Sequence, residues 1–273
     1  ITFVFAIGAL FSVYIPQPEI SEAGREGTGN LWQESAYGFR YIFARRSLLG
    51  LQLVFTIGNF FATLGLTLLA PMILARTGNN EMVLGTVQSA GAVGGVVGGL
   101  LMSSTGGLRR RIHGVLAGWI LGSLFGEALL GLGQSLPVWI VASFIFAFFV
   151  PLINASNQSI WQSKVMPDVQ GRVFSVRRMI AIVVVPIAQL LAGPLADQVF
   201  EPAMMPGGNL VPVFGSLVGV GPGGGMALIL VIVGLLAAST GLIGYAVRTI
   251  RNVEDLLPDH DAVAEGVKGR APA

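Results

Sequence analysis

Glu127 is a carboxylate placed well inside a long apolar run of this sequence, the stretch 113–133. A carboxyl group surrounded by hydrocarbon is costly, so its presence needs an explanation. It could relay a proton or pair with a cation. The alternative is that it reaches a water boundary and helps to hold helices together, because no basic residue is an obvious partner inside the apolar runs. Asp197 ends the apolar stretch 177–197, where solvation at the boundary explains it.

Five amide side chains in or beside apolar runs could line a polar cavity. Asn154, Asn157 and Trp161 follow one another at spacings of three and four residues, so they share one face of a helix. One polar face suits the wall of a water-filled cavity. The competing interpretation is hydrogen bonding between helices, typically about 0.6 kcal/mol for each bond, and it is favoured for Gln189. The substrate-cavity candidates are Asn59, Asn154, Asn157, Gln158 and Gln189.

The sequence carries no enzyme signature. Cysteine is absent, so disulfides, thiolate metal sites and cysteine nucleophiles are excluded. Two histidines, His113 and His260, form neither an HExxH motif nor a Ser-His-Asp triad. The Gly-rich segment 219–225 lacks the Lys-Ser/Thr pair of a phosphate-binding loop. A net charge of +2 is too small to indicate nucleic acid as a partner, and no cofactor or metal is expected.

The composition indicates that these side chains act inside a membrane. Hydrophobic residues make up 53% of the chain and charged residues only 11%, whereas a soluble domain carries about 25% charged residues. Porin-like strands are excluded, because they would alternate apolar and polar residues. Six stretches have the length and low charge of a membrane-spanning helix, which predicts an all-α membrane protein. The predicted spans are 47–71, 82–104, 113–133, 136–158, 177–197 and 225–247.

The basic residues orient these spans. If the carboxy terminus is cytoplasmic, 15 of the 16 Lys and Arg residues fall in cytoplasmic segments, and Arg76 alone lies outside. The positive-inside rule therefore predicts a multi-pass protein with a cytoplasmic carboxy terminus. Basic loops that bind anionic partners are the alternative, but this needs an extra assumption.

Four segments follow one another along the chain. Residues 1–16 would span about 22 Å as a helix, short of the roughly 30 Å hydrocarbon core, so we interpret them as the end of a helix that is cut off at its front. Residues 17–46 form a cytoplasmic linker. Residues 47–248 form a six-helix transmembrane bundle, and residues 249–273 form a polar tail that is expected to be mobile.

Two connecting segments have a composition that predicts their structure. In the linker, apolar residues recur at helical spacing and predict an amphipathic helix that lies along the membrane surface. The residues of this apolar face are Trp32, Ala36, Phe39 and Phe43. The segment 198–224 is rich in Gly and Pro and is expected to be irregular.

A stripe of small residues marks the second span. Gly91, Gly95 and Gly99 repeat every four residues, with Gly94 and Gly98 beside them. The stripe gives a smooth helix face for close packing. It could also serve as a sliding surface during a conformational change, and the two roles are compatible.

Two segments resemble motifs of the major facilitator superfamily. The first begins at Gly99 and ends in an arginine run, and it resembles the family pattern G-x-x-x-D-R-x-G-R-R. Ser103 stands where the family has an acid that helps to latch the cytoplasmic gate, and one extra residue precedes the arginines. The second, residues 167–175, is similar to the P-x-x-x-G-R-V-F-S element of the macrolide-efflux and enterobactin-exporter-like branch. The gate candidates are Gly99, Arg109, Arg110, Arg111, Asp168, Gly171 and Arg172.

In the second motif, Gly171 is expected to allow a tight turn, and Arg172 to offer a charge to a gate network at the inner surface. Ordinary loop chemistry is the alternative. The resemblance covers nearly the whole chain and implies the carboxy-terminal half of a twelve-helix transporter: the end of a sixth helix, the linker and helices seven to twelve. On this plan the spans 47–71 and 136–158 line the cavity, and Glu127 lies on a peripheral helix.

The resemblance also implies a function. It implies a secondary transporter in the plasma (inner) membrane that exports a small amphipathic molecule, a drug or a siderophore, by alternating access with proton coupling. The expected partners are the lipid bilayer, the substrate and the missing amino-terminal half. The alternatives are a non-transporting membrane scaffold and a membrane-embedded lipid-processing protein, whose catalytic groups would have to come from the missing part.

Overall fold

The structure, a computed structural model, describes residues 31–260, and the side chains from residue 36 onward. Every regular element in this range is helical, and six helices are long and apolar enough to cross a membrane. The predicted all-α membrane protein with six spans is therefore confirmed. The segment predicted as the end of an earlier helix, the first part of the linker and the last part of the tail lie outside the described residues.

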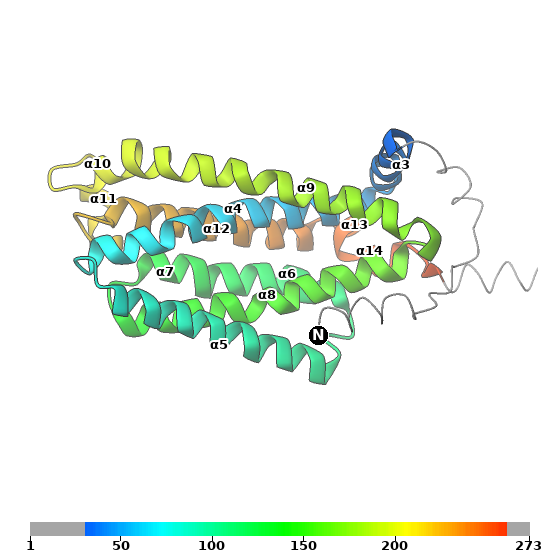
Figure 1. Cartoon of the computed structure of the whole chain (residues 1–273), viewed down its shortest axis with the longest axis horizontal. Helices are drawn as coiled ribbons and strands as arrows, with labels where there is room; N and C mark the ends of the chain where they lie inside the picture. The colour runs from blue at the N-terminus through cyan, green and yellow to red at the C-terminus, as the bar shows by residue number, and fades with distance from the viewer. Residues whose placement is uncertain (1–30, 261–273) are drawn as a thin grey trace, which may run out of the picture.

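The six spans run back and forth along one elongated bundle (Figure 1). They are α4 (Arg46–Arg76), α5 (Glu81–Thr105), α6 (Arg111–Gly122) with its continuations η1 (Ser123–Ala128) and α7 (Leu129–Leu132), α8 (Leu136–Lys164), α9 (Pro167–Pro194) with η2 (Leu195–Phe200) and α10 (Glu201–Met204), and α12 (Gly224–Ala246). Four shorter helices are α3 (Leu31–Ala44), α11 (Val211–Val218), α13 (Arg248–Arg251) and α14 (Val253–Leu256). The elements η1 and η2 are π-helical turns.

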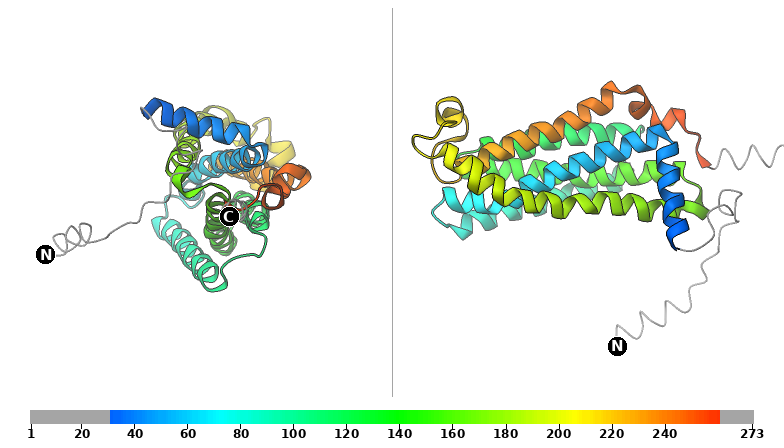
Figure 2. Two further views of the ribbon diagram at one scale, coloured as in Figure 1. Left: turned by 90° about the vertical axis from the view of Figure 1, so that its right-hand side faces the viewer. Right: turned by 90° about the horizontal axis from the view of Figure 1, so that it is seen from above.

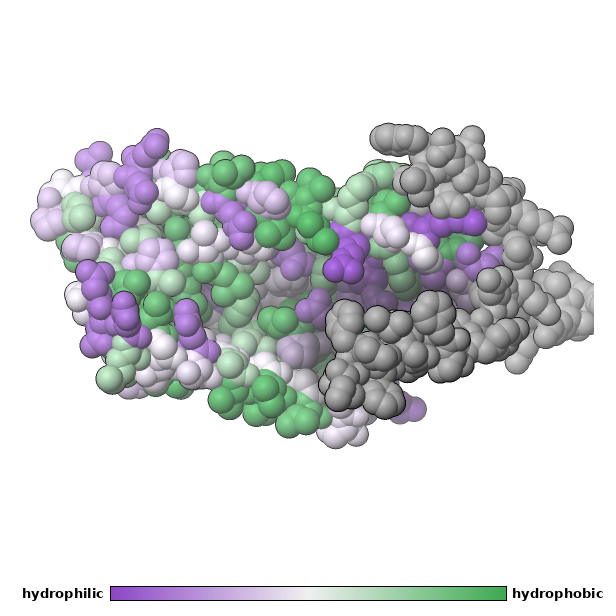
Figure 3. Space-filling view, in the orientation of Figure 1, coloured by the Kyte–Doolittle hydropathy of each residue, from purple (hydrophilic) through white to green (hydrophobic). Residues whose placement is uncertain are grey.

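The two ends of the bundle differ in charge. Helices α3, α13 and α14 lie at one end, toward which all the described basic residues gather except Arg76; we call it the basic end. Arg76 lies at the opposite end, the Arg76 end, with α10 and α11. Apolar side chains predominate along the middle of the visible face, and polar ones gather at the Arg76 end (Figure 3). This distribution suits a bundle that crosses a membrane from one polar end to the other.

Burial distinguishes the central spans from the outer ones. Helix α12 is the most enclosed, and it packs on α4, α6 and η1. In the most apolar stretch of α5, and in that of the span beginning with α9, only 17% of the residues are buried. Most of their side chains therefore face outward. The large apolar side chains they expose include Val96, Leu100, Ile182 and Leu190.

Helix α9 begins ten residues before its predicted start. Pro167 occupies its first turn, where a missing N–H costs nothing, and Asp168 follows it as an acid at a helix amino terminus. The predicted span began at the charged residues 177–178, whereas the helix already runs through the ten residues before them. Gly171 consequently lies inside a helix with no positive φ, and the predicted tight turn at this position is wrong.

Two predicted irregular segments are partly helical. The segment 198–224 contains α10 and α11 between its turns. The beginning of the tail, expected to be mobile, forms α13 and α14 and packs on the basic end. Val253 is fully buried, and Lys164 donates hydrogen bonds to the backbone carbonyls of Glu254 and Leu257.

Helix α3 lies across the basic end rather than along the bundle (Figure 2). It contacts α9 closely at Gly38, where an added Cβ would lie 2.6 Å from a methyl carbon of Val176. Tyr41 and Ile42 are buried, while Phe43 is 60% exposed. The helix therefore docks on the bundle through Tyr41 and Ile42. Of the predicted apolar face, Phe39 is partly buried against the core and Phe43 points away from it.

Candidate substrate pocket

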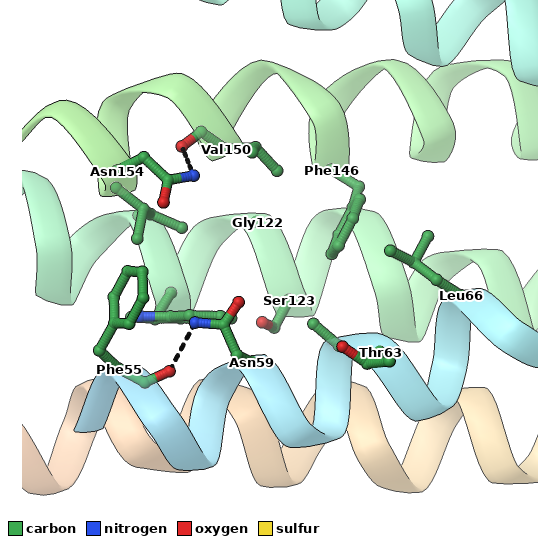
Figure 4. Close-up of a pocket in the computed structure, with 13 residues that line it drawn as sticks. Phe55, Asn59, Thr63, Leu66, Gly122, Ser123, Phe146, Val150 and Asn154 are labelled. Atoms are coloured by element: carbon green, nitrogen blue, oxygen red, sulfur yellow. Dashed lines mark hydrogen bonds between the residues drawn. The ribbon is translucent and has the colours of Figure 1, made fainter. Parts of the chain in front are cut away.

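A pocket of about 150 Å³ opens between α4, the α6–η1 span and α8 (Figure 4). Two close contacts between helices shape its walls. Trp119 crosses α4 at Gly58, where an added Cβ would lie 2.7 Å from the indole ring, and Phe146 contacts the η1 backbone at Gly126. The lining residues are Phe55, Asn59, Ala62, Thr63, Leu66, Gly118, Trp119, Gly122, Ser123, Phe146, Val150, Ile153 and Asn154.

Two of the predicted amides meet at this pocket. Asn59 Nδ2 donates to the Phe55 carbonyl at 2.7 Å, and Asn154 Nδ2 donates to the Val150 carbonyl at 2.9 Å. These bonds within each helix hold the amide groups in place. Figure 4 shows the two side-chain oxygens directed toward the space between α4 and α8. Both oxygens are therefore positioned to accept hydrogen bonds from a ligand.

The remaining lining is aromatic, aliphatic or hydroxyl-bearing. Phe55 and Trp119 meet edge to face, with ring centroids 6.3 Å apart. Thr63 and Ser123 add hydroxyl groups, and no charged residue is among the thirteen that line the pocket. Such a surface suits an apolar ligand body that carries a few hydrogen-bonding groups.

The other predicted amides lie elsewhere. Asn157 is fully buried, and neither polar atom of its side chain has a hydrogen-bond partner among the described residues. Gln158 accepts a hydrogen bond from Arg177 at 2.8 Å. Gln189 is exposed on α9, outside this pocket. Of the two residues predicted to share one face of the helix, Asn154 therefore lines the pocket and Asn157 is buried.

Glu127 does not reach the water boundary expected under the packing interpretation. It is 2% exposed, in the π-helical turn η1, and neither carboxyl oxygen has a hydrogen-bond partner among the described residues. The carboxyl group touches α4 at Gly65. An added Cβ there would overlap Oε1 of Glu127, so only glycine allows this approach.

The first gate motif spans the turn between α5 and α6. Gly99 lies in α5, and a Cβ added to it would meet open space. Gly106 ends α5 in the left-handed conformation, φ 68°. Arg109 is exposed, Arg110 pairs with Asp255 at 3.0 Å, and Arg111 Nη1 donates to the Ser159 carbonyl at 3.1 Å.

In the second gate motif, Asp168 and Arg172 both interact with neighbouring groups. The Arg172 carbonyl lies beside Gly38 of α3, at 2.9 Å from the position of an added Cβ. Gly171 faces open space. The amino-terminal turns of α9 are therefore covered by α3.

Several pocket residues were not predicted from the sequence. Thr63 and Ser123 are small hydroxyl residues that membrane helices also use for packing, so their type carries little signal. Ser123 stands four residues before Glu127, and this spacing is a usable clue to a shared face. Trp119 and Phe146 are aromatic residues of apolar spans, and only the packing of three helices brings them together.

No family model and no solved structure matches this chain. Two curated relatives, both named macrolide efflux protein A and both from Streptococcus pyogenes (one of serotype M6), are 25% identical to it over 189 residues, which is 67% of this chain. The chain is a homologue of a macrolide efflux protein. The resemblance predicted from its sequence is thereby confirmed.

The matched part of the chain covers 45% of the length of each of these relatives, which is less than half. The six membrane-length helices and the efflux relatives together make the chain a multi-pass membrane protein.

Proposed function

We propose that this chain forms the carboxy-terminal half of a twelve-helix major facilitator transporter that exports small amphipathic drugs, macrolides among them. The observation that carries the proposal is the uncharged pocket between α4, α6 and α8, which combines aromatic walls with the oxygens of Asn59 and Asn154. A macrolide offers a matching surface, because its apolar ring carries hydroxyl groups that can donate to these oxygens.

The size of the pocket supports a second wall from the amino-terminal half. A volume of about 150 Å³ is below the roughly 300–1,000 Å³ of sites for drug-sized ligands. Asn154 is exposed, so the pocket is open on its side. In a twelve-helix protein the other six helices would close this side and complete the cavity.

The charge distribution supports a plasma-membrane orientation with the carboxy terminus in the cytoplasm. The basic end carries twelve of the thirteen described Lys and Arg residues, as the positive-inside rule expects of a cytoplasmic face. Helix α3 would lie along that face, with the exposed side chain of Phe43 in the membrane interface. Alternating access would then move the two halves against each other around the pocket.

The proposal is tested by expressing the complete gene in cells that lack their own drug exporters and measuring accumulation of radiolabelled erythromycin. Cells with the wild-type protein should accumulate several-fold less than cells with the empty vector. Asn59→Leu and Asn154→Leu should each raise accumulation, while membrane levels of the protein stay unchanged.

Gln189→Leu is the matched control, because it makes the same amide-to-leucine change on an exposed face of α9 outside the pocket. It should keep wild-type export. Equal export by all three variants would remove the pocket from the transport site. Equal accumulation with and without the wild-type protein would overturn macrolide export itself.

A further inference from the structure

The carboxyl group of Glu127 is enclosed by three helices just behind the pocket. It contacts Gly65 of α4 and lies near Val233 of α12: a Cβ added to Gly65 would meet the side chains of both Glu127 and Val233. Ala128, next to Glu127, packs against the backbone of Gly234. The group thus lies at a junction where glycines allow the closest approach of helices.

The charged and titratable side chains on the helices that pack against η1 all stand in the first or last turn of their helix. Arg76 is eleven residues beyond Gly65, which corresponds to about 16 Å along α4. Tyr245 is twelve residues beyond Val233, or about 18 Å along α12. None of them is hydrogen-bonded to Glu127. The full set on α4, α6, α8 and α12 is Arg46, Arg76, Arg111, His113, Lys164 and Tyr245.

A carboxylate at this position would be a buried charge without a counter-charge or hydrogen bond. The penalty for such a charge is several kcal/mol, and the neutral acid avoids most of it. We propose that Glu127 is a proton-binding site of the transporter, loaded with a proton in the packed arrangement seen here and emptied when α4 separates from η1.

The pocket and Glu127 share a wall. On α4, Ala62 and Leu66 line the pocket. Gly65, which lies between them in the sequence, does not line the pocket and contacts the carboxyl group of Glu127 instead. On the α6–η1 span, Ser123 lines the pocket one turn before Glu127, and its hydroxyl has no partner among the described residues. A shift of α4 away from η1 would therefore open a path from the pocket to the carboxyl group past Ser123.

This arrangement links the proton to the substrate, and this part rests on the proposed function. A ligand that pushes α4 outward from the pocket admits water to Glu127. The O–H bond then breaks, the proton passes to water in the pocket, and the carboxylate remains, now hydrated. Return of α4 expels the water and favours the protonated acid again. Glu127 stands in the π-helical turn η1, and such turns are often found at functional sites.

The test of loading is infrared spectroscopy on the complete protein in lipid vesicles at neutral pH. The C=O stretching band of a protonated carboxyl group should be present in the wild type and absent in Glu127→Gln, which has nearly the same shape. Asp197→Asn is the matched control: Asp197 is an exposed acid in η2, the continuation of α9, so this variant should keep the band. A wild-type spectrum that does not differ from that of Glu127→Gln would overturn the proposal.

Release of the proton from Glu127 is tested by adding erythromycin to the same vesicles. The band should weaken, and a weakly buffered suspension should acidify, in the wild type and in Asp197→Asn but not in Glu127→Gln. An unchanged band with bound erythromycin would overturn the coupling between pocket and proton. If erythromycin does not bind at all, the proposed function fails, whereas the band in its absence still decides whether Glu127 holds a proton.

Discussion

Arg177 donates a hydrogen bond from Nη1 to Oε1 of Gln158 at 2.8 Å, and its guanidinium lies 5.2 Å from the ring centroid of Trp161. Arg177 belongs to α9, whereas Gln158 and Trp161 belong to α8. The backbone carbonyl of Arg177 also accepts a hydrogen bond from Gln52 of α4 at 3.1 Å. One residue therefore ties three spans together near the basic end.

Replacement of Arg177 should loosen this junction. Arg177→Ala removes the hydrogen bond and the contact with Trp161, and should lower the free energy of unfolding by about 1–3 kcal/mol. Arg177→Lys should restore only part of the loss, because an ammonium group lacks the planar face that lies over the indole. The melting temperature of the purified protein in detergent is the measurement.

Arg178→Ala is the control, because its side chain is exposed next to Arg177 on the same helix. It should change the melting temperature little. Equal losses for the two alanine variants would mean that charge at this end of the bundle matters, and not the contact of Arg177 with α8.

The glycines of α5 fall into two classes. A Cβ at Gly94 or Gly98 would overlap the backbone carbonyls of Phe144 or Phe148 in α8, whereas a Cβ at Gly99 meets open space. Gly94→Ala and Gly98→Ala should force the two helices apart and reduce folded protein in the membrane. Gly99→Ala should be neutral, or stabilising by up to about 1 kcal/mol, because alanine is the better helix former.

Fluorescence-detected size-exclusion chromatography with increasing temperature distinguishes the two classes. The packing interpretation requires a lower transition for Gly94→Ala and Gly98→Ala than for Gly99→Ala. If all three variants behave alike, α5 does not pack on α8 through this stripe.

The existence and number of the spans could be predicted from sequence, because each one is a long run of apolar residues. The predicted ends of the spans were less accurate than their number. Arg177 and Lys164 lie within helices, although charge suggested a boundary, because their side chains find partners at the basic end. The glycine stripe was recognised, but the sequence could not say which face of it meets α8. That choice depends on the rotation of one helix against another.

The candidate site was only partly accessible to sequence reasoning. An amide in an apolar run is costly, which marks Asn59 and Asn154 as candidates, and both line the pocket. The same cost marks Asn157, yet it is fully buried. The pattern of one helix cannot separate these outcomes, because they depend on which neighbouring helix covers each face. The aromatic walls carried no signal, since α4 and α8 also carry phenylalanines that do not line the pocket, such as Phe60 and Phe144.

Arg76 organises the opposite end of the bundle. Its guanidinium donates to the carbonyls of Gly133 at 3.1 Å and Gly223 at 3.2 Å, and to that of Val218. Arg76→Lys should lower the melting temperature measurably, because a single ammonium group cannot reach all three carbonyls in the same geometry. Arg109→Lys, at an exposed position in the other end, should leave it unchanged. A thermal shift assay on both proteins would show whether Arg76 holds the loops together.

Glu254 and Asp255 are neighbouring acids of the tail with different partners. The Glu254 carboxylate accepts hydrogen bonds from the backbone N–H groups of Arg111 at 3.2 Å and Ile112 at 3.0 Å, so it caps the first turn of α6. Asp255 forms an exposed ion pair with Arg110. Glu254→Gln should cost about 1–2 kcal/mol, as loss of a charged cap at a helix amino terminus does. Asp255→Asn should cost about 0–1 kcal/mol, because exposed ion pairs contribute little.

The difference between the Glu254 cap and the Asp255 ion pair can be measured by hydrogen exchange of the first turn of α6, followed by mass spectrometry. Glu254→Gln should accelerate exchange at residues 111–113, and Asp255→Asn should not. High salt should weaken the contribution of Asp255 further while leaving that of Glu254 largely intact, since the cap is partly buried and screening acts mainly on exposed charges. Equal exchange in the two variants would mean that the tail does not cap α6, and that its other contacts, the burial of Val253 and the hydrogen bonds from Lys164, hold it on the bundle.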